Sequence, residues 1–176
     1  IKGSKTLLQY VCDGDNTDTH VMQFCFPDEA AFQEFLISFE SSTIAQLLGD
    51  KLNANINNIS EWLGTPAWYQ NDWSKDQVFM VWELEVSDTQ TYANAFVPFA
   101  KKIMKKMNIT NSMGLGYPIL GQDSFSHFVW AGAPDVQTAL KRTKQFYADP
   151  EFAKFSEQVG GIRTVSYTHL RAHETQ

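Results

Sequence analysis

The chain has 176 residues, of which 43% are hydrophobic and 14% aromatic, and this composition excludes a disordered protein. Its formal net charge of −6 argues against nucleic acid and anionic membranes as main partners, because both require a basic surface. No apolar run reaches the ~18 residues of a membrane-spanning helix. We therefore expect a cytoplasmic protein without a membrane partner.

The first half begins with an apolar segment, a turn and a predicted strand at residues 20–26. Pro27 ends this strand because proline cannot donate a backbone hydrogen bond to a sheet. Asp28 then suits the N-cap of a helix. The apolar side chains of this helix are spaced i, i+3, i+4 and i+7, which predicts one buried face: Phe32, Phe35, Leu36 and Phe39.

A dense group of aromatic residues precedes the second half. We expect it to cover the junction between the halves or to line a ligand pocket there: Trp62, Trp68, Tyr69 and Trp73. Residues 77–86 then alternate, which predicts a strand with five apolar side chains on one face: Val78, Met80, Trp82, Leu84 and Val86.

The remaining elements alternate between helix and strand. A helix capped by Asp88 and kinked at Pro98 is expected over 88–107. Its predicted inward residues are Tyr92, Phe96, Ile103 and Met107. Strands at 113–120 and 125–133, a helix pair at 135–160 and a final strand from Ile162 complete the order. In the helix pair the predicted inward residues are Val136, Leu140, Thr143, Tyr147, Phe152, Phe155 and Val159.

Related side chains recur at an offset of 107 residues: Leu8 and Leu115, Tyr10 and Tyr117, His20 and His127, and Pro27 and Pro134. The order of elements recurs as well, which predicts tandem ferredoxin-like units of order β-α-β-β-α-β. The first unit (1–70) lacks its first strand and helix and is thus truncated at its N-terminus. A linker (71–76) and the second unit (77–164) follow. By the same offset, the absent strand would begin about thirty residues upstream of Ile1.

Such a tandem pair, with Pro-Asp after the third strand and the run DPEFAKFSEQVGGIRT, resembles the dimeric α+β barrel superfamily, which includes antibiotic-biosynthesis-type monooxygenases. The resemblance implies an α+β fold in which the two units pair as an intrachain barrel. It also implies a small-molecule-binding protein with a cavity between sheet and helices. Enzymes of this type act on aromatic or polyketide-like molecules or haem, and a cofactor-independent oxygenase is one expected form.

Two residue pairs recur between the copies. His20 and His127 are candidate catalytic bases or ligand contacts, although a structural histidine bonded to the backbone is the alternative. Tyr10 and Tyr117 are candidate ligand-binding residues. The expected hairpin register places Tyr117 opposite Phe128, so that each tyrosine and its histidine lie on opposite faces. Only one of the two pairs can then line a given cavity.

Trp82 and Trp130 are further candidates for the wall of a ligand pocket, with core packing as the alternative. No metal site is predicted in residues 1–164, and no cofactor is expected. A small molecule is the expected partner, and a homo-oligomer is left open. The alternative function is a non-catalytic structural or protein-interaction module, for which we expect a filled interior and a contiguous exposed apolar patch.

The C-terminal tail carries a specific signature of another kind. Residues 165–175 read VSYTHLRAHET and match the translation of a transposase-type adapter used in short-read library preparation, as in a metagenomic fragment. We therefore expect residues 165–176 to be a non-native tail that packs poorly. His169 and His173 lie at a spacing that suits a metal on a helix, but on this interpretation they bind none.

Overall fold

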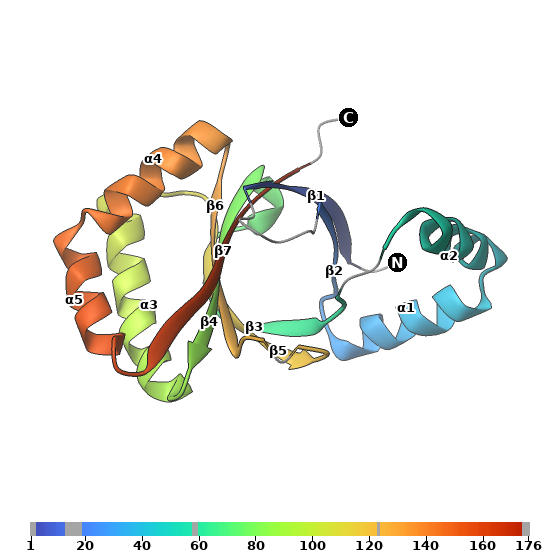
Figure 1. The fold of residues 1–176 in the computed structure, drawn as a ribbon, viewed down its shortest axis with the longest axis horizontal. Coiled ribbons are helices and arrows are strands. Elements are labelled where there is room, and N and C mark those ends of the chain that lie inside the picture. Colours follow the sequence, from blue (N-terminus) through green and yellow to red (C-terminus); the bar gives the residue numbers. More distant parts are fainter. Residues whose placement is uncertain (1–2, 13–18, 58–59, 123, 174–176) are drawn as a thin grey trace.

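A computed structural model describes residues 3–12, 19–57, 60–122 and 124–173, which form an α+β fold with one curled sheet (Figure 1). The described strands are β1 (Ser4–Cys12), β2 (His20–Cys25), β3 (Leu63–Gln70), β4 (Val78–Val86), β5 (Met113–Leu120), β6 (His127–Ala133) and β7 (Arg163–His173). The described α-helices are α1 (Glu29–Ser41), α2 (Thr43–Asn55), α3 (Thr89–Lys106), α4 (Val136–Tyr147) and α5 (Pro150–Val159). None of these helices is both long and apolar enough to cross a membrane.

The strands follow the order β2-β1-β7-β4-β6-β5-β3, and every neighbouring pair is antiparallel. The second half alone supplies β7-β4-β6-β5, with β4 between β7 and β6 as in a ferredoxin-like sheet. Strands of the first half extend this sheet on both sides, because β1 pairs with β7 and β3 pairs with β5. The sheet is therefore shared between the two halves of the chain, as the sequence predicts.

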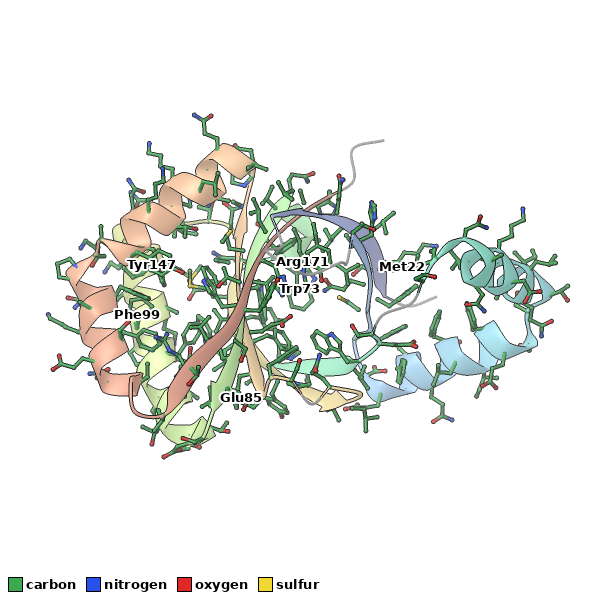
Figure 2. All side chains as sticks on the ribbon, in the orientation of Figure 1. Met22, Trp73, Glu85, Phe99, Tyr147 and Arg171 are labelled. Carbon is green, nitrogen blue, oxygen red and sulfur yellow. The ribbon has the colours of Figure 1, made fainter. Side chains whose placement is uncertain are left out.

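Helices α3, α4 and α5 cover one face of the central strands (Figure 1). The predicted apolar face of β4 points toward these helices, and the predicted inward residues of α3 and α5 are buried or partly buried in the same core. Phe99 of α3, which the periodicity missed, stacks on Phe155 with 4.5 Å between ring centroids. Figure 2 shows Phe99 and Tyr147 within this helix layer.

The predicted inward face of α4 is partly wrong. Leu140 is exposed, and the buried residue is its neighbour Ala139. The helix turns Ala139, Arg142, Thr143 and Phe146 toward the sheet, a spacing of i, i+3, i+4 and i+7 that contains a charged residue. Counting apolar residues alone misplaced the face because a charged side chain occupies one of its positions.

Aromatic side chains of the junction pack on the other face of the sheet. The Trp62 ring lies 5.3 Å from Phe128, and the Trp73 ring lies 6.2 Å from Trp130. Trp68 lies on the helix side instead, with its ring 6.0 Å from Phe96. These contacts join the segment around β3 to the second half, in agreement with the first of the two roles expected for the aromatic group.

Two glycines of β5 make room for these rings. A Cβ at Gly114 would overlap the Trp130 ring, and one at Gly116 would overlap Phe128. Because the rings lie directly over the glycine backbone, the strand and the aromatic layer approach more closely than any side chain would allow.

The limits of the elements follow the offset of 107 residues. The offset carries the start of β2 at His20 to that of β6 at His127, and the start of α1 at Glu29 to that of α4 at Val136. Both helices are N-capped by an aspartate, since Asp28 Oδ1 accepts from Ala31 N at 2.7 Å and Asp135 Oδ1 accepts from Thr138 N at 2.6 Å. The turn predicted near residues 14–17 lies outside the described residues.

The expectation that residues 166–176 pack poorly is wrong for residues 166–173. This segment belongs to β7 and pairs with β4 on one side and β1 on the other. His169 is buried, with its Nε2 3.0 Å from Glu83 Oε1, and this burial counts against an adapter origin. Backbone pairing itself depends little on side-chain identity. The adapter origin stays a prediction, which sequencing an independently isolated copy of the gene would test.

Gly114→Ala is expected to destabilise the fold by ~1–3 kcal/mol, because the added methyl group forces the Trp130 ring out of its position. Urea unfolding followed by circular dichroism measures this change. Gly49→Ala in α2 is the control: nothing lies within 4 Å of the added Cβ, so the helix should gain ~0.5–1 kcal/mol. Equal effects of the two substitutions would contradict this role of Gly114.

Candidate functional site

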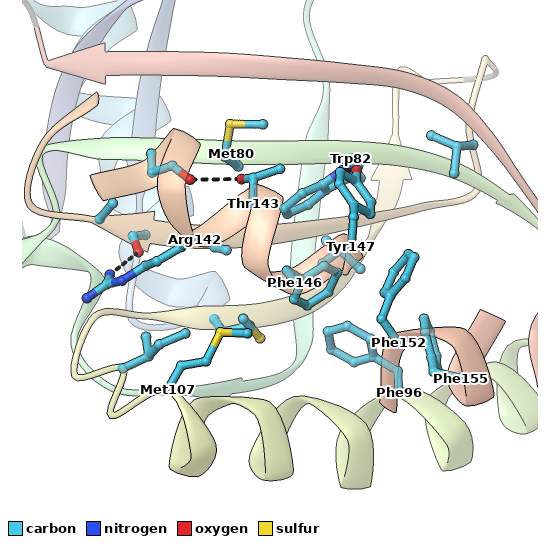
Figure 3. A pocket seen from close by; sticks show the side chains of 18 of the residues that line it. Met80, Trp82, Phe96, Met107, Arg142, Thr143, Phe146, Tyr147, Phe152 and Phe155 are labelled. Carbon is cyan, nitrogen blue, oxygen red and sulfur yellow. Dashed lines mark hydrogen bonds between the residues drawn. The ribbon is translucent and has the colours of Figure 1, made fainter. Parts of the chain in front are cut away.

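A cavity of about 210 Å³ lies between the helix-facing side of β4 and β6 and helices α3, α4 and α5 (Figure 3). Its walls are mainly aromatic and apolar, with Trp82, Phe96, Phe146, Phe152 and Phe155 as the largest contributors. A cavity of about 150 Å³ holds one benzene ring. This cavity is therefore large enough for a small, flat, mainly apolar molecule of about two fused rings.

Trp82 and Tyr147 form a polar edge in this wall. The indole Nε1–H of Trp82 donates to Tyr147 Oη at 2.9 Å, which links β4 to the last turn of α4. The Trp82 ring also stacks on Phe146, with 6.2 Å between centroids. The hydrogen bond satisfies the indole donor and fixes the ring plane, so that a flat apolar surface faces the cavity.

Arg142 brings a positive charge to the cavity lining. Its Nη1 donates to Asn111 Oδ1 at 2.8 Å and to the carbonyl oxygen of Gly132 at 3.5 Å. Asn111 in turn donates from Nδ2 to Asp76 Oδ1 at 2.6 Å. Asn111 thus bridges the guanidinium and the carboxylate and fixes the position of Arg142 beside the apolar walls.

The Asp76 carboxylate is fully buried and needs polar partners, since an unpaired buried charge is costly. Besides Asn111, it accepts a hydrogen bond from Ser112 N at 3.1 Å. The Ser112 hydroxyl accepts from Trp130 Nε1 at 3.1 Å. A Cβ at Gly132 would overlap the carboxylate, so glycine is required at that point of β6. This network was not foreseen, because Asp76, Asn111 and Arg142 are distant in sequence and form no motif.

Tyr92 places a hydroxyl at the other end of the lining. Burial raises the pKa of Tyr92 to about 12, and the positive charge of Arg163 opposes that rise. The phenol therefore stays protonated at neutral pH. It can donate or accept a hydrogen bond but is not a ready base.

His127 is buried on the helix side of β6, but it does not line the cavity. Its Nδ1 lies 2.9 Å from Ser126 Oγ, and its Nε2 has no hydrogen-bond partner among the described residues. The ring lies 6.3 Å from Tyr92, so contact with the cavity runs through that tyrosine. Burial lowers the pKa of His127, and the negative charge of Glu85 opposes this shift.

The predicted register of the second hairpin is wrong by one residue. Gly116, not Tyr117, lies opposite Phe128, and this places the Tyr117 ring 6.4 Å from His127. Tyr117 and His127 therefore share a face, contrary to the expectation. The expectation assumed a turn centred one half-residue away, and strand alternation reverses faces for a shift of one. Tyr117 itself is exposed and does not line the cavity.

The other predicted site residues are dispersed. His20 is exposed at the start of β2, with Nδ1 3.0 Å from Thr19 Oγ1. Tyr10 lies under Arg171, whose guanidinium carbon is 4.9 Å from the ring centroid. Trp130 packs on the sheet face away from the cavity. Of the predicted site residues, the cavity lining contains Trp82 alone.

The described residues contain no group of three or more histidine, cysteine, aspartate or glutamate side chains placed to hold a metal ion. The chemistry of the cavity therefore rests on Arg142, on the hydroxyl groups of Tyr92, Thr143 and Tyr147, and on aromatic surface.

Comparisons with known proteins place this architecture among solved structures. No protein-family model matches the chain, and no curated protein matches it significantly. The structure of a "putative monooxygenase" from Lactobacillus acidophilus NCFM superposes with a TM-score of 0.58 at 14% identity, over 95% of this chain and 77% of that chain.

Two further structures are similar. A "putative monooxygenase" from Fusobacterium nucleatum gives a TM-score of 0.56 at 12% identity, over 99% of this chain and 80% of that chain. An "anthrone oxidase-like protein" gives 0.55 at 11% identity, over 96% and 76%. At these identities the similarity shows the fold, which is the α+β barrel type of monooxygenase-like proteins.

His127→Gln is expected to reduce the loss of thermal stability between about pH 7.5 and pH 5.5. Because the pKa of His127 is lowered in the folded protein, the unfolded chain binds this proton first, and stability falls as the pH drops through about 6.5. Thermal unfolding at both pH values measures the effect. His20→Gln, at an exposed position, should leave the pH dependence unchanged, and an unaltered dependence in His127→Gln would contradict the assignment.

Proposed function

We propose that the protein binds a small planar aromatic molecule with one acidic oxygen in the cavity between β4, β6 and the helices. The observation that carries the proposal is the position of Arg142 at the edge of an otherwise aromatic wall. A flat apolar body suits stacking on Trp82 and Phe146. The guanidinium favours an oxygen that carries negative charge, such as a carboxylate, phenolate or enolate.

The cavity also bears on the alternative function. A non-catalytic interaction module was expected to have a filled interior, whereas about 210 Å³ remain open between sheet and helices. The cavity therefore supports small-molecule binding over that alternative.

As the finer proposal, the bound molecule is oxidised by molecular oxygen without a cofactor, as the neighbouring monooxygenase-like and anthrone oxidase-like proteins suggest. In such a reaction an activated CH₂ group loses a proton, and the resulting enolate transfers an electron to O₂. Combination of the two radicals gives a hydroperoxide, which loses water to leave a carbonyl group. One CH₂ and one O₂ thus become one C=O and one H₂O.

The described residues assign roles in this reaction. Arg142 would stabilise the enolate oxygen, since a fixed positive charge beside an apolar wall is worth more than one in water. The cavity lining contains no aspartate, glutamate or histidine among the described residues, so the proton would pass to solvent. The substrate must then have an acidic C–H bond of its own, as anthrone does.

Arg142→Met is expected to weaken binding of 2-naphthoate at least tenfold and to change binding of naphthalene less than twofold. A charge-assisted hydrogen bond contributes ~1.5–3 kcal/mol, which is a factor of ten or more. Ala131→Phe, which fills the cavity, should weaken both probes. Titration calorimetry for 2-naphthoate and fluorescence for naphthalene measure these affinities.

Lys141→Met is the matched control for charge, because it removes an exposed lysine from the same helix and should change neither affinity. Ala54→Phe on α2 controls for added aromatic volume outside the cavity. If the protein binds neither probe, or if Ala131→Phe binds both as the unaltered protein does, the cavity is not the binding site.

Oxygen consumption with anthrone tests the reaction separately from binding. The protein should accelerate oxygen uptake above the rate in buffer, and Arg142→Met should remove most of that acceleration while Lys141→Met keeps it. Binding of the naphthalene probes without any acceleration would refute the oxygenase proposal and leave the binding proposal intact.

A further inference from the structure

The two ends of the sheet occupy corresponding positions in the two halves. In the second half, β4 lies between β6 and β7 and pairs with both. The offset of 107 residues relates β6 to β2, and β3 follows α2 as β7 follows α5. In the first half these two counterparts, β2 and β3, are the edge strands of the sheet. Each edge presents backbone donors and acceptors that another strand can pair with.

Side chains beside these edges are bare where their counterparts are covered. Met22 of β2 is 48% exposed, whereas Val129, at the equivalent position of β6, is 8% exposed. Figure 2 shows Met22 on the far side of the molecule from helices α3–α5. The β2 sheet face thus lacks the cover that helices give to β6.

The same contrast is found on the helices. Leu48 of α2 is 51% exposed, whereas Phe155, its counterpart on α5, is 3% exposed. Phe155 is buried because α3 packs beside it, with Phe96 and Phe99 in ring contact. No residue of α2 is buried, and Ile44 and Leu47 on the same helix are also exposed. The helix pair α1–α2 lacks a neighbour that would correspond to α3 (Figure 1).

We propose that a strand followed by an amphipathic helix, carried by the same polypeptide ahead of Ile1, fills both positions. The strand pairs antiparallel with β2 and β3 and closes the curled sheet into a barrel. The helix packs its apolar face on Leu48 of α2 and on the β2 face around Met22. This segment is the first-half counterpart of β4 and α3.

Two observations favour the same polypeptide over a second copy of the chain. The strand and the helix absent from the first half are consecutive in the repeated order, so one continuous segment supplies both. The solved structures provide the second observation. Matches that span 95–99% of this chain leave about a fifth of each solved chain unmatched, which is room for a strand and a helix.

The chain itself provides a probe for this position. A copy of residues 77–107 joined directly ahead of Ile1 keeps the offset of 107, because Met107 then precedes Ile1 as residue 107 precedes 108. Hydrogen exchange of the β2 and β3 amides should slow at least tenfold in this fusion. Fluorescence of an added anilinonaphthalene dye should fall as the apolar surface becomes covered. A fusion of the same residues in scrambled order is the control and should change neither.

A cross-link tests the register of the added strand. Phe79 lies opposite Gly132 in the second half, and the offset moves Gly132 to Cys25, whose thiol is not in a disulfide. A Phe79→Cys change within the fused copy should therefore form a disulfide with Cys25, since directly opposed strand residues lie within the Cα separation that disulfides need. Met80→Cys in the copy points to the other face and should not. Cys25→Ser should abolish the link.

The unfused chain supplies the outcomes that overturn the proposal. Slow exchange of the β2 and β3 amides in a monomeric chain would mean that the sheet is already closed. Slow exchange in a dimer, identified by light scattering, would assign the position to a second copy. An exchange rate that the fusion leaves unchanged, with no Cys25 cross-link, would also refute the proposal.

Discussion

The pairing of β4 with β6 on one side and with β7 on the other is the constraint on which the rest of the structure depends. Its register decides which side chains of three strands face the helices. Met80 and Trp82 consequently enter the cavity wall, while Glu83 points to the opposite face beside His169 and Arg171. A shift of one residue would exchange the two faces and remove both the cavity and its aromatic lining.

The cavity combines two kinds of constraint that reinforce each other. Helices α3, α4 and α5 supply aromatic surface, whereas the loops before β4 and β5 supply Asp76 and Asn111, which hold Arg142. Because the carboxylate is buried, its hydrogen bonds also fix the start of both strands. The residues that orient the charge of the candidate site thus also stabilise the sheet beneath it.

The two halves of the chain share an order of elements but differ in how completely their faces are covered. The second half buries Phe155 and Val159 of α5 under α3, whereas α2 exposes the side chains at the corresponding positions or covers them only in part. The aromatic contacts of Trp62 and Trp73 still bind the halves together on the other face of the sheet. The shared sheet and the uncovered helices together account for a structure that is closed on one side and open on the other.

The sequence by itself determined the order of elements, the α+β class, the inward face of β4 and most of the buried residues of α3 and α5, because these depend on local alternation, helical periodicity and capping. Only the tertiary structure decided the cavity, the Asp76–Asn111–Arg142 network and the pairing of Tyr117 with His127. The network joins residues 35 and 31 positions apart, and no local pattern records such a contact. The tyrosine–histidine pairing depends on the hairpin register, and a change of a single residue reverses which side chains share a face.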